Sequence, residues 1–335
     1  MAEIAPSELV LPRLSCPFPS LINPHVDQVD RETYSWLVAS HMISDQAELD
    51  RYREAAYGWL GARTYPYAEP SELRLVTDWC VWLFAFDDAF CESDRRAAEI
   101  ARALPQLLAV LDDAGAGEEA ADPFARALLD VKLRVAEAGN PDQLDRWRWV
   151  TKDYLFAQVW EAANREDDIV PTYGDYIFMR RRTGAMLTVF ALIDLAAGHP
   201  LTAAEWRHPD TRAITQFAND VVVWDNDLLS YAKERGGVNA RNNLVSVLSR
   251  HRHRSIQDAM NLIGRMRDEA ISGMQDLRVR LERLTSPAVD AYVRGLEHWI
   301  SGSIAYSLTS TRYTRAWQGH SQPRPHHRHP HHRHN

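Results

Sequence analysis

Three oxygen-bearing side chains recur at four-residue intervals in the segment NDLLSYAKE. They are Asn226, Ser230 and Glu234. On an α-helix, this spacing places an amide oxygen, a hydroxyl and a carboxylate on one face. Mg²⁺ prefers oxygen ligands of this kind. A polar stripe on an exposed helix is the plain alternative, but the apolar residues just before the segment indicate a buried helix, so we predict a metal site.

A second group of acids follows a strongly apolar stretch, in the segment FAFDDAFCESD. Asp87 and Asp88 are adjacent, and Glu92 comes shortly after them. Two neighbouring carboxylates at the end of an apolar helix are costly unless water or a cation compensates them. The same residues also suit a solvated helix terminus, so this motif alone leaves both interpretations open.

In their order and spacing, FDDAFCE and NDLLSYAKE resemble the aspartate-rich motif and the Asn/Ser/Glu triad of bacterial class I terpene synthases. Arg180 stands where such enzymes carry an arginine that senses diphosphate, and Arg312-Tyr313 resembles their Arg-Tyr pair. The opening CPFPSLINPH is similar to their N-terminal segment, which packs over the mouth of the active site. The resemblance covers residues 16–317.

The resemblance implies an all-α fold, a single-domain helical bundle around a central apolar cavity. It also implies an enzyme that uses three Mg²⁺ ions to ionise a linear isoprenoid diphosphate and then cyclises the carbocation. Arginine offers a fork of donors suited to phosphate, whereas lysine acts as a point charge. The implied metal ligands are Asp87, Asp88, Glu92, Asn226, Ser230 and Glu234, and the implied diphosphate-binding residues are Arg180, Lys233, Arg312 and Tyr313.

The resemblance also assigns finer roles around these motifs. Asp88 would form a salt bridge in the closed state, and Gly184 would be the effector residue. A glycine there permits a helix break that points a carbonyl dipole at the nascent cation. Two positions depart from the family: Thr183 stands where an aspartate often links the sensor arginine to the effector, and Glu92 stands where many relatives have aspartate.

Apolar and aromatic side chains are expected to form the cavity wall, where aromatic faces can stabilise positive charge. One and two helical turns before Asp87 the chain has Leu83, Phe84 and Cys80. The resemblance adds Trp299 and Tyr306 to this wall. Phe156 and Trp160 are weaker candidates for the same role.

Helical spacing dominates the chain after its proline-rich start, and no alternation of period two is sustained. We predict an extended segment over 1–29 that caps the active site, one domain over 30–317, and a disordered His-rich tail over 318–335. The predicted helices cover 30–43, 46–61, 71–90, 94–113, 122–138, 142–166, 172–197, 203–207, 209–234, 241–252, 255–284 and 287–316.

The composition restricts the function further. The chain has 335 residues, is 45% hydrophobic and carries a formal net charge of −8, which disfavours a nucleic-acid partner because such proteins usually need a basic stripe. No apolar run reaches the length of a membrane span. The three cysteines make no disulfide framework, so we expect reduced thiols and a cytoplasmic protein.

Several alternatives stay open at this point. A chain-elongating prenyltransferase shares the fold and the metal chemistry, but it usually has a second DDxxD-type motif where this chain has NDLLSYAKE. A non-enzymatic helical scaffold has no need of three oxygen donors on one helix face. Farnesyl and geranylgeranyl diphosphate suit the residues equally well, so a sesquiterpene and a diterpene product are both compatible with them. The resemblance also allows a homodimer.

Overall fold

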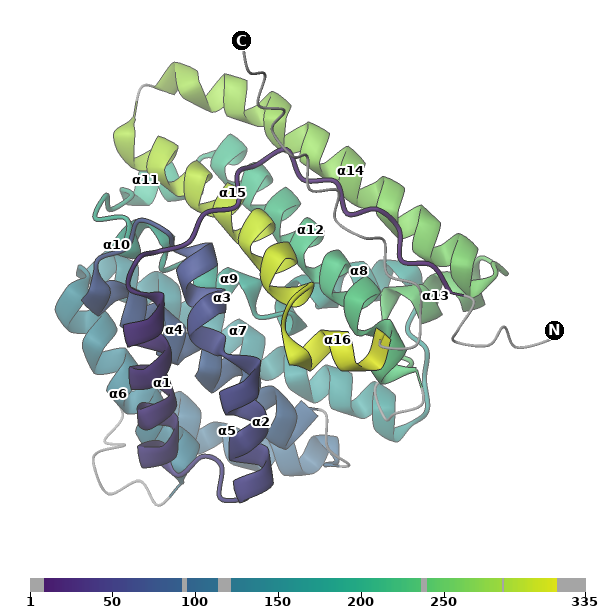
Figure 1. Cartoon of the computed structure of the whole chain (residues 1–335), viewed down its shortest axis with the longest axis horizontal. Coiled ribbons are helices and arrows are strands. Elements are labelled where there is room, and N and C mark those ends of the chain that lie inside the picture. Colours follow the sequence, from purple (N-terminus) through teal and green to yellow (C-terminus); the bar gives the residue numbers. More distant parts are fainter. Residues whose placement is uncertain (1–8, 92–94, 114–121, 236–239, 285, 318–335) are drawn as a thin grey trace, which may run out of the picture.

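The structure of the protein, a computed structural model, describes residues 9–91, 95–113, 122–235, 240–284 and 286–317. Every regular element in these ranges is helical, which confirms the all-α prediction (Figure 1). The elements are α1 (Val26–Ser40), α2 (Gln46–Ala55), α3 (Tyr57–Thr64), α4 (Pro70–Phe86), the π-helical turn η2 (Asp87–Cys91), α5 (Ala97–Leu111), α6 (Pro123–Ala138), α7 (Pro141–Glu166), α8 (Tyr173–Thr183), α9 (Met186–Phe190), α10 (Ile193–Ala196), α11 (Ala203–Arg207), α12 (Pro209–Glu234), α13 (Leu244–His251), α14 (Ile256–Leu281), the 3₁₀ turn η3 (Glu282–Leu284), α15 (Pro287–Ser307) and α16 (Thr311–Trp317).

Local sequence explains where many of these helices begin. Proline stands in the first turn of α4, α6, α7, α12 and α15, where its missing N–H costs no intrahelical bond. Asn140 and Thr202 form capping boxes at the starts of α7 and α11, so their side chains satisfy backbone N–H groups that the helix leaves unpaired. These signals account for the agreement between the predicted and observed helix starts.

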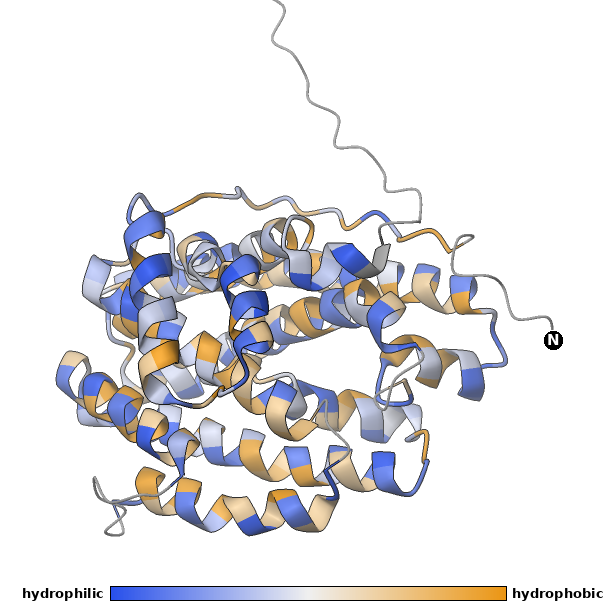
Figure 2. Ribbon diagram, turned by 60° about the horizontal axis from the view of Figure 1, so that its bottom comes forward, coloured by the Kyte–Doolittle hydropathy of each residue, from blue (hydrophilic) through white to orange (hydrophobic). Residues whose placement is uncertain are grey.

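Two long buried helices carry the two predicted metal motifs. α4 is apolar on nearly all of its faces and packs against α1, α3 and α6. α12 packs against α14 and α15, and its central turns are buried on most sides. In the turned view of Figure 2, hydrophobic and hydrophilic residues alternate along the outer helices, as expected when one face of each helix is buried. The bundle therefore surrounds α4 and α12, which face each other across its interior.

Three predicted helices are broken in the structure, so their uninterrupted spans were wrong. The helix predicted over 46–61 is α2 and α3, that over 172–197 is α8, α9 and α10, and that over 287–316 is α15 and α16. In addition, regular α-helix gives way to the π-helical turn at Asp87, within the span predicted over 71–90.

Tertiary packing explains two of these breaks. At the first, Ala56 adopts a left-handed conformation with φ 53°, and α3 packs so closely on α1 that a Cβ on Gly58 would lie 2.4 Å from Asp30 Cα. At the second, Ala185 has φ 61°, and a Cβ on Gly184 would lie 2.4 Å from Val223 Cγ1 of α12. Close contact with a neighbouring helix thus requires glycine beside each break, which a helical pattern in the sequence does not reveal.

Residues 9–23 of the N-terminal segment are extended, as predicted, and lie along α14, α15 and α3, whereas the extension predicted to residue 29 was wrong because α1 begins at Val26. Val10 exchanges two hydrogen bonds of 2.8 Å with Gln257, and Arg267 Nη1 donates to the Ser15 carbonyl at 2.6 Å. Ser301 Oγ donates to the Pro19 carbonyl at 2.9 Å. Figure 1 shows this segment running beside α14 before it reaches α1. Its proposed capping of the active site stays a prediction, and residues 1–8 and 318–335 lie outside the described part.

Among the described helices, none combines the length and the apolar character needed to cross a membrane.

Candidate active site

One cavity brings together nearly all of the predicted site residues. It is enclosed by α3, α4, α7, α8, α9, α12, α15 and α16, and its empty volume is about 1260 Å³, part of which opens to solvent. Fourteen of the lining residues were predicted from the sequence: Cys80, Leu83, Phe84, Asp87, Arg180, Gly184, Asn226, Ser230, Lys233, Glu234, Trp299, Tyr306, Arg312 and Tyr313. Asp88 lies beside the cavity without lining it, and Glu92 lies outside the described residues.

The α12 side of the cavity holds the three oxygen donors as predicted, on one helix face. Asn226 Oδ1 accepts from Arg180 Nη2 at 2.8 Å, and Asn226 Nδ2 donates to the Tyr313 hydroxyl at 3.2 Å. Glu234 accepts from Asn243 Nδ2 at 3.0 Å. Burial raises the pKa of Glu234 to about 7 despite this hydrogen bond. A cation beside the carboxylate would offset the cost of burying its charge.

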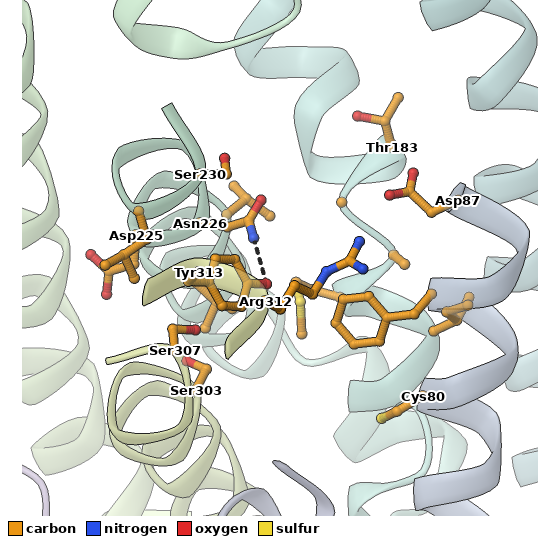
Figure 3. A pocket seen from close by; sticks show the side chains of 18 of the residues that line it. Cys80, Asp87, Thr183, Asp225, Asn226, Ser230, Ser303, Ser307, Arg312 and Tyr313 are labelled. Atoms are coloured by element: carbon orange, nitrogen blue, oxygen red, sulfur yellow. Dashed lines mark hydrogen bonds between the residues drawn. The ribbon is translucent and has the colours of Figure 1, made fainter. Parts of the chain in front are cut away.

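The opposite side of the cavity is formed by the end of α4. Asp87 lies in the π-helical turn and faces Asn226 and Ser230 across the cavity (Figure 3). Its neighbour Asp88 is bound by Arg312 through two hydrogen bonds of 2.8 and 3.0 Å. Asp88 also accepts from the Tyr52 hydroxyl at 2.6 Å. Burial acts to raise the pKa of Asp88, but Arg312 and Tyr52 hold it below the usual value.

The donors on the two sides fit Mg²⁺. Ser230 Oγ is buried beside the Glu234 carboxylate, yet it makes no hydrogen bond of acceptable geometry to any residue that the structure describes, which is an unusual state for a buried hydroxyl. A metal ligated by Asn226, Ser230 and Glu234 would satisfy all three oxygens. No group of three or more His, Cys, Asp or Glu side chains arranged for a metal occurs in the described ranges. The site therefore depends on amide and hydroxyl oxygens as well as carboxylates, which suits a hard cation.

Cationic side chains line the same cavity between the two groups of oxygen donors. Arg180 reaches in from the last turn of α8, Arg312 from α16, and the more exposed Lys233 from the last turn of α12. Arg312 also lies over the ring of Phe84, 4.8 Å from its centroid. This cluster of positive groups in an enclosed site is suited to a phosphate-bearing ligand.

Three residues that hold the cationic cluster in place were not predicted from the sequence. Asp227 is 1% exposed and pairs with Arg180, with its Oδ1 2.7 Å from Nη2 and 2.9 Å from Nε. Tyr176 donates its hydroxyl to Asp227 Oδ2 at 2.7 Å. Asn243 donates both to the Asp227 carbonyl at 2.9 Å and to Glu234. Burial acts against the charge of Arg180, but Asp227 keeps its pKa above the ordinary value.

Part of this support was visible in the sequence. Asp227 follows Asn226 directly in NDLLSYAKE, and Asn243 has the type and position of an N-cap for α13. Nothing in the sequence, however, joins Tyr176 or Asn243 to the motif, because each reaches Asp227 only through the fold. Glu161 of α7 also lines the cavity, and burial raises its pKa although Arg180 and Thr183 oppose this effect.

The wall of the cavity is apolar away from the charged groups. Cys80, Leu83 and Phe84 of α4 line it as predicted, as do Trp299 and Tyr306 of α15. Two weaker candidates do not belong to the wall. Phe156 is 56% exposed because α7 turns the neighbouring Tyr154 and Leu155 inward instead, and Trp160 does not line the cavity either.

The break between α8 and α9 also contributes to the wall. Thr183, Gly184, Ala185 and Met186 all line the cavity, next to Arg180. The family resemblance implied a helix break at Gly184, although the helix predicted over 172–197 did not include one, and α8 ends beside this residue. The Thr183 side chain hydrogen-bonds Glu161 and so opposes the rise in its pKa that burial causes, while Asp227 supplies the carboxylate that holds Arg180.

Comparisons with known proteins agree with this geometry. A family model described as "Terpene synthase family 2, C-terminal metal binding" matches residues 78–272. The chain is 68% identical to the 4-epi-cubebol synthase ((2E,6E)-farnesyl diphosphate cyclizing) of Streptosporangium roseum, over 94% of this chain and 96% of that one. It is 32% identical to the (+)-T-muurolol synthase ((2E,6E)-farnesyl diphosphate cyclizing) of Roseiflexus castenholzii, over 90% of this chain and 93% of that one.

Solved structures show the same fold. The crystal structure of SVS_A2, a protein from ancestral sequence reconstruction, matches with a TM-score of 0.83 at 27% identity and covers 94% of this chain and 95% of its own. Germacradien-4-ol synthase from Streptomyces citricolor matches with a TM-score of 0.77 at 24% identity, over 88% and 97% of the two chains, and supports the fold alone.

Proposed function

Because the chain belongs to the bacterial class I terpene synthases, we propose that it binds farnesyl diphosphate with Mg²⁺, ionises it and cyclises the farnesyl cation to a sesquiterpene. The relative from S. roseum, whose name specifies farnesyl diphosphate, supports the choice of this substrate over geranylgeranyl diphosphate. The products that these two relatives are named for, 4-epi-cubebol and (+)-T-muurolol, carry the ending -ol of an alcohol, so we extend the proposal to a hydroxylated product.

One observation carries the proposal: a single cavity combines an apolar wall with two facing sets of oxygen donors and a cluster of cationic side chains. Ionisation of an allylic diphosphate creates a diphosphate anion and an allyl cation. The anion needs positive groups where its charge develops, and the cation needs an apolar enclosure without free water. Both requirements are met in this one cavity.

The roles of the residues follow from their positions. On one side of the cavity, Mg²⁺ would be held by Asn226, Ser230 and Glu234. On the other side it would be held by Asp87. A metal ion held there would supply positive charge to offset the negative charge of the diphosphate.

The cationic and apolar residues complete this arrangement. Arg180, oriented by the buried Asp227, and Arg312, oriented by the half-buried Asp88, donate hydrogen bonds to the diphosphate oxygens, with Lys233 and Tyr313 beside them. Trp299 lines the same cavity and supplies an aromatic ring for the migrating positive charge.

A direct experiment tests this function. The purified protein is incubated with farnesyl diphosphate alone, with and without Mg²⁺, and the extract is analysed by gas chromatography with mass spectrometry. We expect a cyclic sesquiterpene only when Mg²⁺ is present, no product with EDTA, and recovery when Mg²⁺ is restored. Activity that survives chelation would refute the metal-assisted ionisation.

The same experiment decides between the remaining alternatives. A prenyltransferase needs isopentenyl diphosphate as a second substrate, so a product from farnesyl diphosphate alone excludes it. Parallel incubations with diphosphates of 10, 15, 20 and 25 carbons compare substrates, and we expect the 15-carbon substrate to react fastest. A non-enzymatic scaffold would convert none of them.

A further inference from the structure

Two serine hydroxyls interrupt the apolar wall of the cavity. Ser303 and Ser307 are four residues apart on α15, so they lie on one face of the helix, and both line the cavity. Trp299 precedes them by one turn, and Arg312 and Tyr313 follow on α16. Figure 3 shows the two serine side chains next to each other, beside Tyr313. They therefore stand between the aromatic part of the wall and the residues assigned to diphosphate.

The hydrogen bonds of these hydroxyls are incomplete. Ser307 is 9% exposed, and its hydroxyl makes no hydrogen bond to any described residue. Ser303 Oγ donates to the Ile300 carbonyl at 3.2 Å, so its oxygen can still accept. A hydroxyl removed from bulk water is costly unless it is paired. Both hydroxyls face the cavity, so a small polar molecule inside it can pair with them.

Most other hydroxyls of the cavity already have a role. The Tyr306 hydroxyl donates to the Ala55 carbonyl at 2.8 Å, and that of Tyr313 accepts from Asn226. Ser230 belongs to the proposed metal site. Among the lining hydroxyls of described residues, that of Tyr154 on the α7 side is a further candidate partner for a polar ligand, and the carboxyl of Glu161 lines the same side. The serine pair is distinguished by two adjacent hydroxyls that can donate to and accept from the same molecule.

We propose that Ser303 and Ser307 hold the water molecule that ends the cation cascade, and so determine that the product is an alcohol. This inference rests on the proposed function. The water oxygen forms a C–O bond to the cationic carbon, and the resulting oxonium loses one proton to the diphosphate anion released by ionisation. No oxidant or reductant is needed. Without an ordered water here, the cation loses a proton from carbon instead and leaves as a hydrocarbon.

Ser301 provides a matched control on the same helix. Its hydroxyl donates to the Pro19 carbonyl of the N-terminal segment and does not line the cavity. Alanine in place of any of these serines removes one oxygen from a helix and favours the helical conformation, so each variant is expected to fold. The variants therefore differ mainly in whether the lost hydroxyl faces the cavity.

The experiment compares the wild type with Ser303→Ala/Ser307→Ala, Ser307→Ala, Ser301→Ala and Tyr154→Phe. Each is incubated with farnesyl diphosphate and Mg²⁺ in ¹⁸O-labelled water, and the alcohol fraction of total product is measured by mass spectrometry. In the double variant we expect the alcohol fraction to fall roughly fivefold or more, because the water loses about one hydrogen bond that stabilises it. The rate at which farnesyl diphosphate is consumed should change little. Ser307→Ala should show a smaller fall, and Ser301→Ala none.

The outcomes separate this inference from the proposed function. Consumption of farnesyl diphosphate by the wild type tests the function, and the ¹⁸O-alcohol fraction tests the serines. An unchanged alcohol fraction in the double variant would overturn the inference, as would a fall confined to Tyr154→Phe. A wild type that gives only hydrocarbons from farnesyl diphosphate would overturn it while leaving the cyclase function intact.

Discussion

The two sides of the cavity hold their oxygen atoms in different ways. On one side, Asn226, Ser230 and Glu234 stand on α12, an unbroken helix of 26 residues. On the other side, regular α-helix has ended, and Asp87 and Asp88 lie in a five-residue π-helical turn. The first set is braced by buried neighbours, whereas Asp88 is ion-paired with an arginine near the other end of the chain.

This difference indicates that the two sides depend on different contacts for their geometry. On α12, Asn243 and the Asp227–Arg180 pair hold the oxygen donors in place, so that side is organised by the core itself. The geometry at the end of α4 depends on how α2 and α16 pack beside it, through Tyr52 and Arg312. We therefore expect α12 substitutions to be the more damaging to turnover, and α4-side substitutions to have graded effects.

The largest effect is expected on α12. Asn226→Leu or Glu234→Ala removes an oxygen from the predicted metal site, and turnover of farnesyl diphosphate should fall by at least ~10³-fold because the charge of the diphosphate is no longer neutralised. Far-ultraviolet circular dichroism should remain helical. Glu269→Ala, an exposed acid on α14, is the control and should retain activity. Normal turnover by Glu234→Ala would contradict the assignment of this side as the metal site.

A smaller effect is expected when the support of Arg180 is weakened. Asp227→Asn keeps the size of the side chain but removes its charge, and we expect kcat to fall about 10- to 100-fold, as is typical for groups that orient functional residues. Tyr176→Phe should cost less. Asp220→Asn is a matched control. Asp220 lies on α12 like Asp227 and pairs with Arg181 of α8, but neither residue lines the cavity. Equal losses for Asp220→Asn and Asp227→Asn would indicate a general effect on folding.

On the α4 side, Tyr52→Phe tests the bracing of Asp88. The variant loses one hydrogen bond to a carboxylate that Arg312 still holds, so kcat/KM should fall only roughly fivefold. Thermal unfolding should change little. Tyr67→Phe, at an exposed tyrosine, is the control. A loss as large as that of Glu234→Ala would show that the two sides do not differ as proposed.

The smallest expected effect is on how the free energy of unfolding depends on pH. Glu234 on one side of the cavity and Asp88 on the other should change it in opposite directions. The pKa of Glu234 is raised by burial from 4.5 to about 7, so the folded protein keeps a proton that the unfolded chain releases. Without metal, its contribution to stability is present below pH 4.5 and lost as the pH rises to about 7. The pKa of Asp88 lies below the usual 3.8, so its contribution is present above that pH and lost on acidification.

Thermal unfolding with EDTA across this pH range measures both effects. Glu234→Gln should flatten the loss of stability between pH 4.5 and 7, and Asp88→Asn should flatten the loss at acid pH. Added Mg²⁺ should stabilise the wild type most at the upper end of the range, because it binds the deprotonated carboxylate. A Glu234→Gln profile identical to that of the wild type would contradict the raised pKa.

The helices and the motif residues could be predicted because their signals are local. Helical spacing of apolar residues indicated most helices, and the spacing of Asn226, Ser230 and Glu234 placed their side chains on one face of α12. That the predicted residues would meet in one cavity was inferred from the family resemblance, because their spacing in the sequence alone does not show it. Phe156 was assigned wrongly because a side chain on α7 faces inward or outward according to its partners.

The sequence by itself determined that the chain is helical, which helices are buried and which oxygen donors share a face, since these depend on residues within a few turns of each other. Only the tertiary structure decided where α2 and α8 end, which carboxylate holds Arg180, and that Ser303 and Ser307 face the cavity. Those features depend on contacts between residues far apart in the chain, such as Gly184 with Val223 and Tyr176 with Asp227. No pattern within a single helix encodes its neighbour.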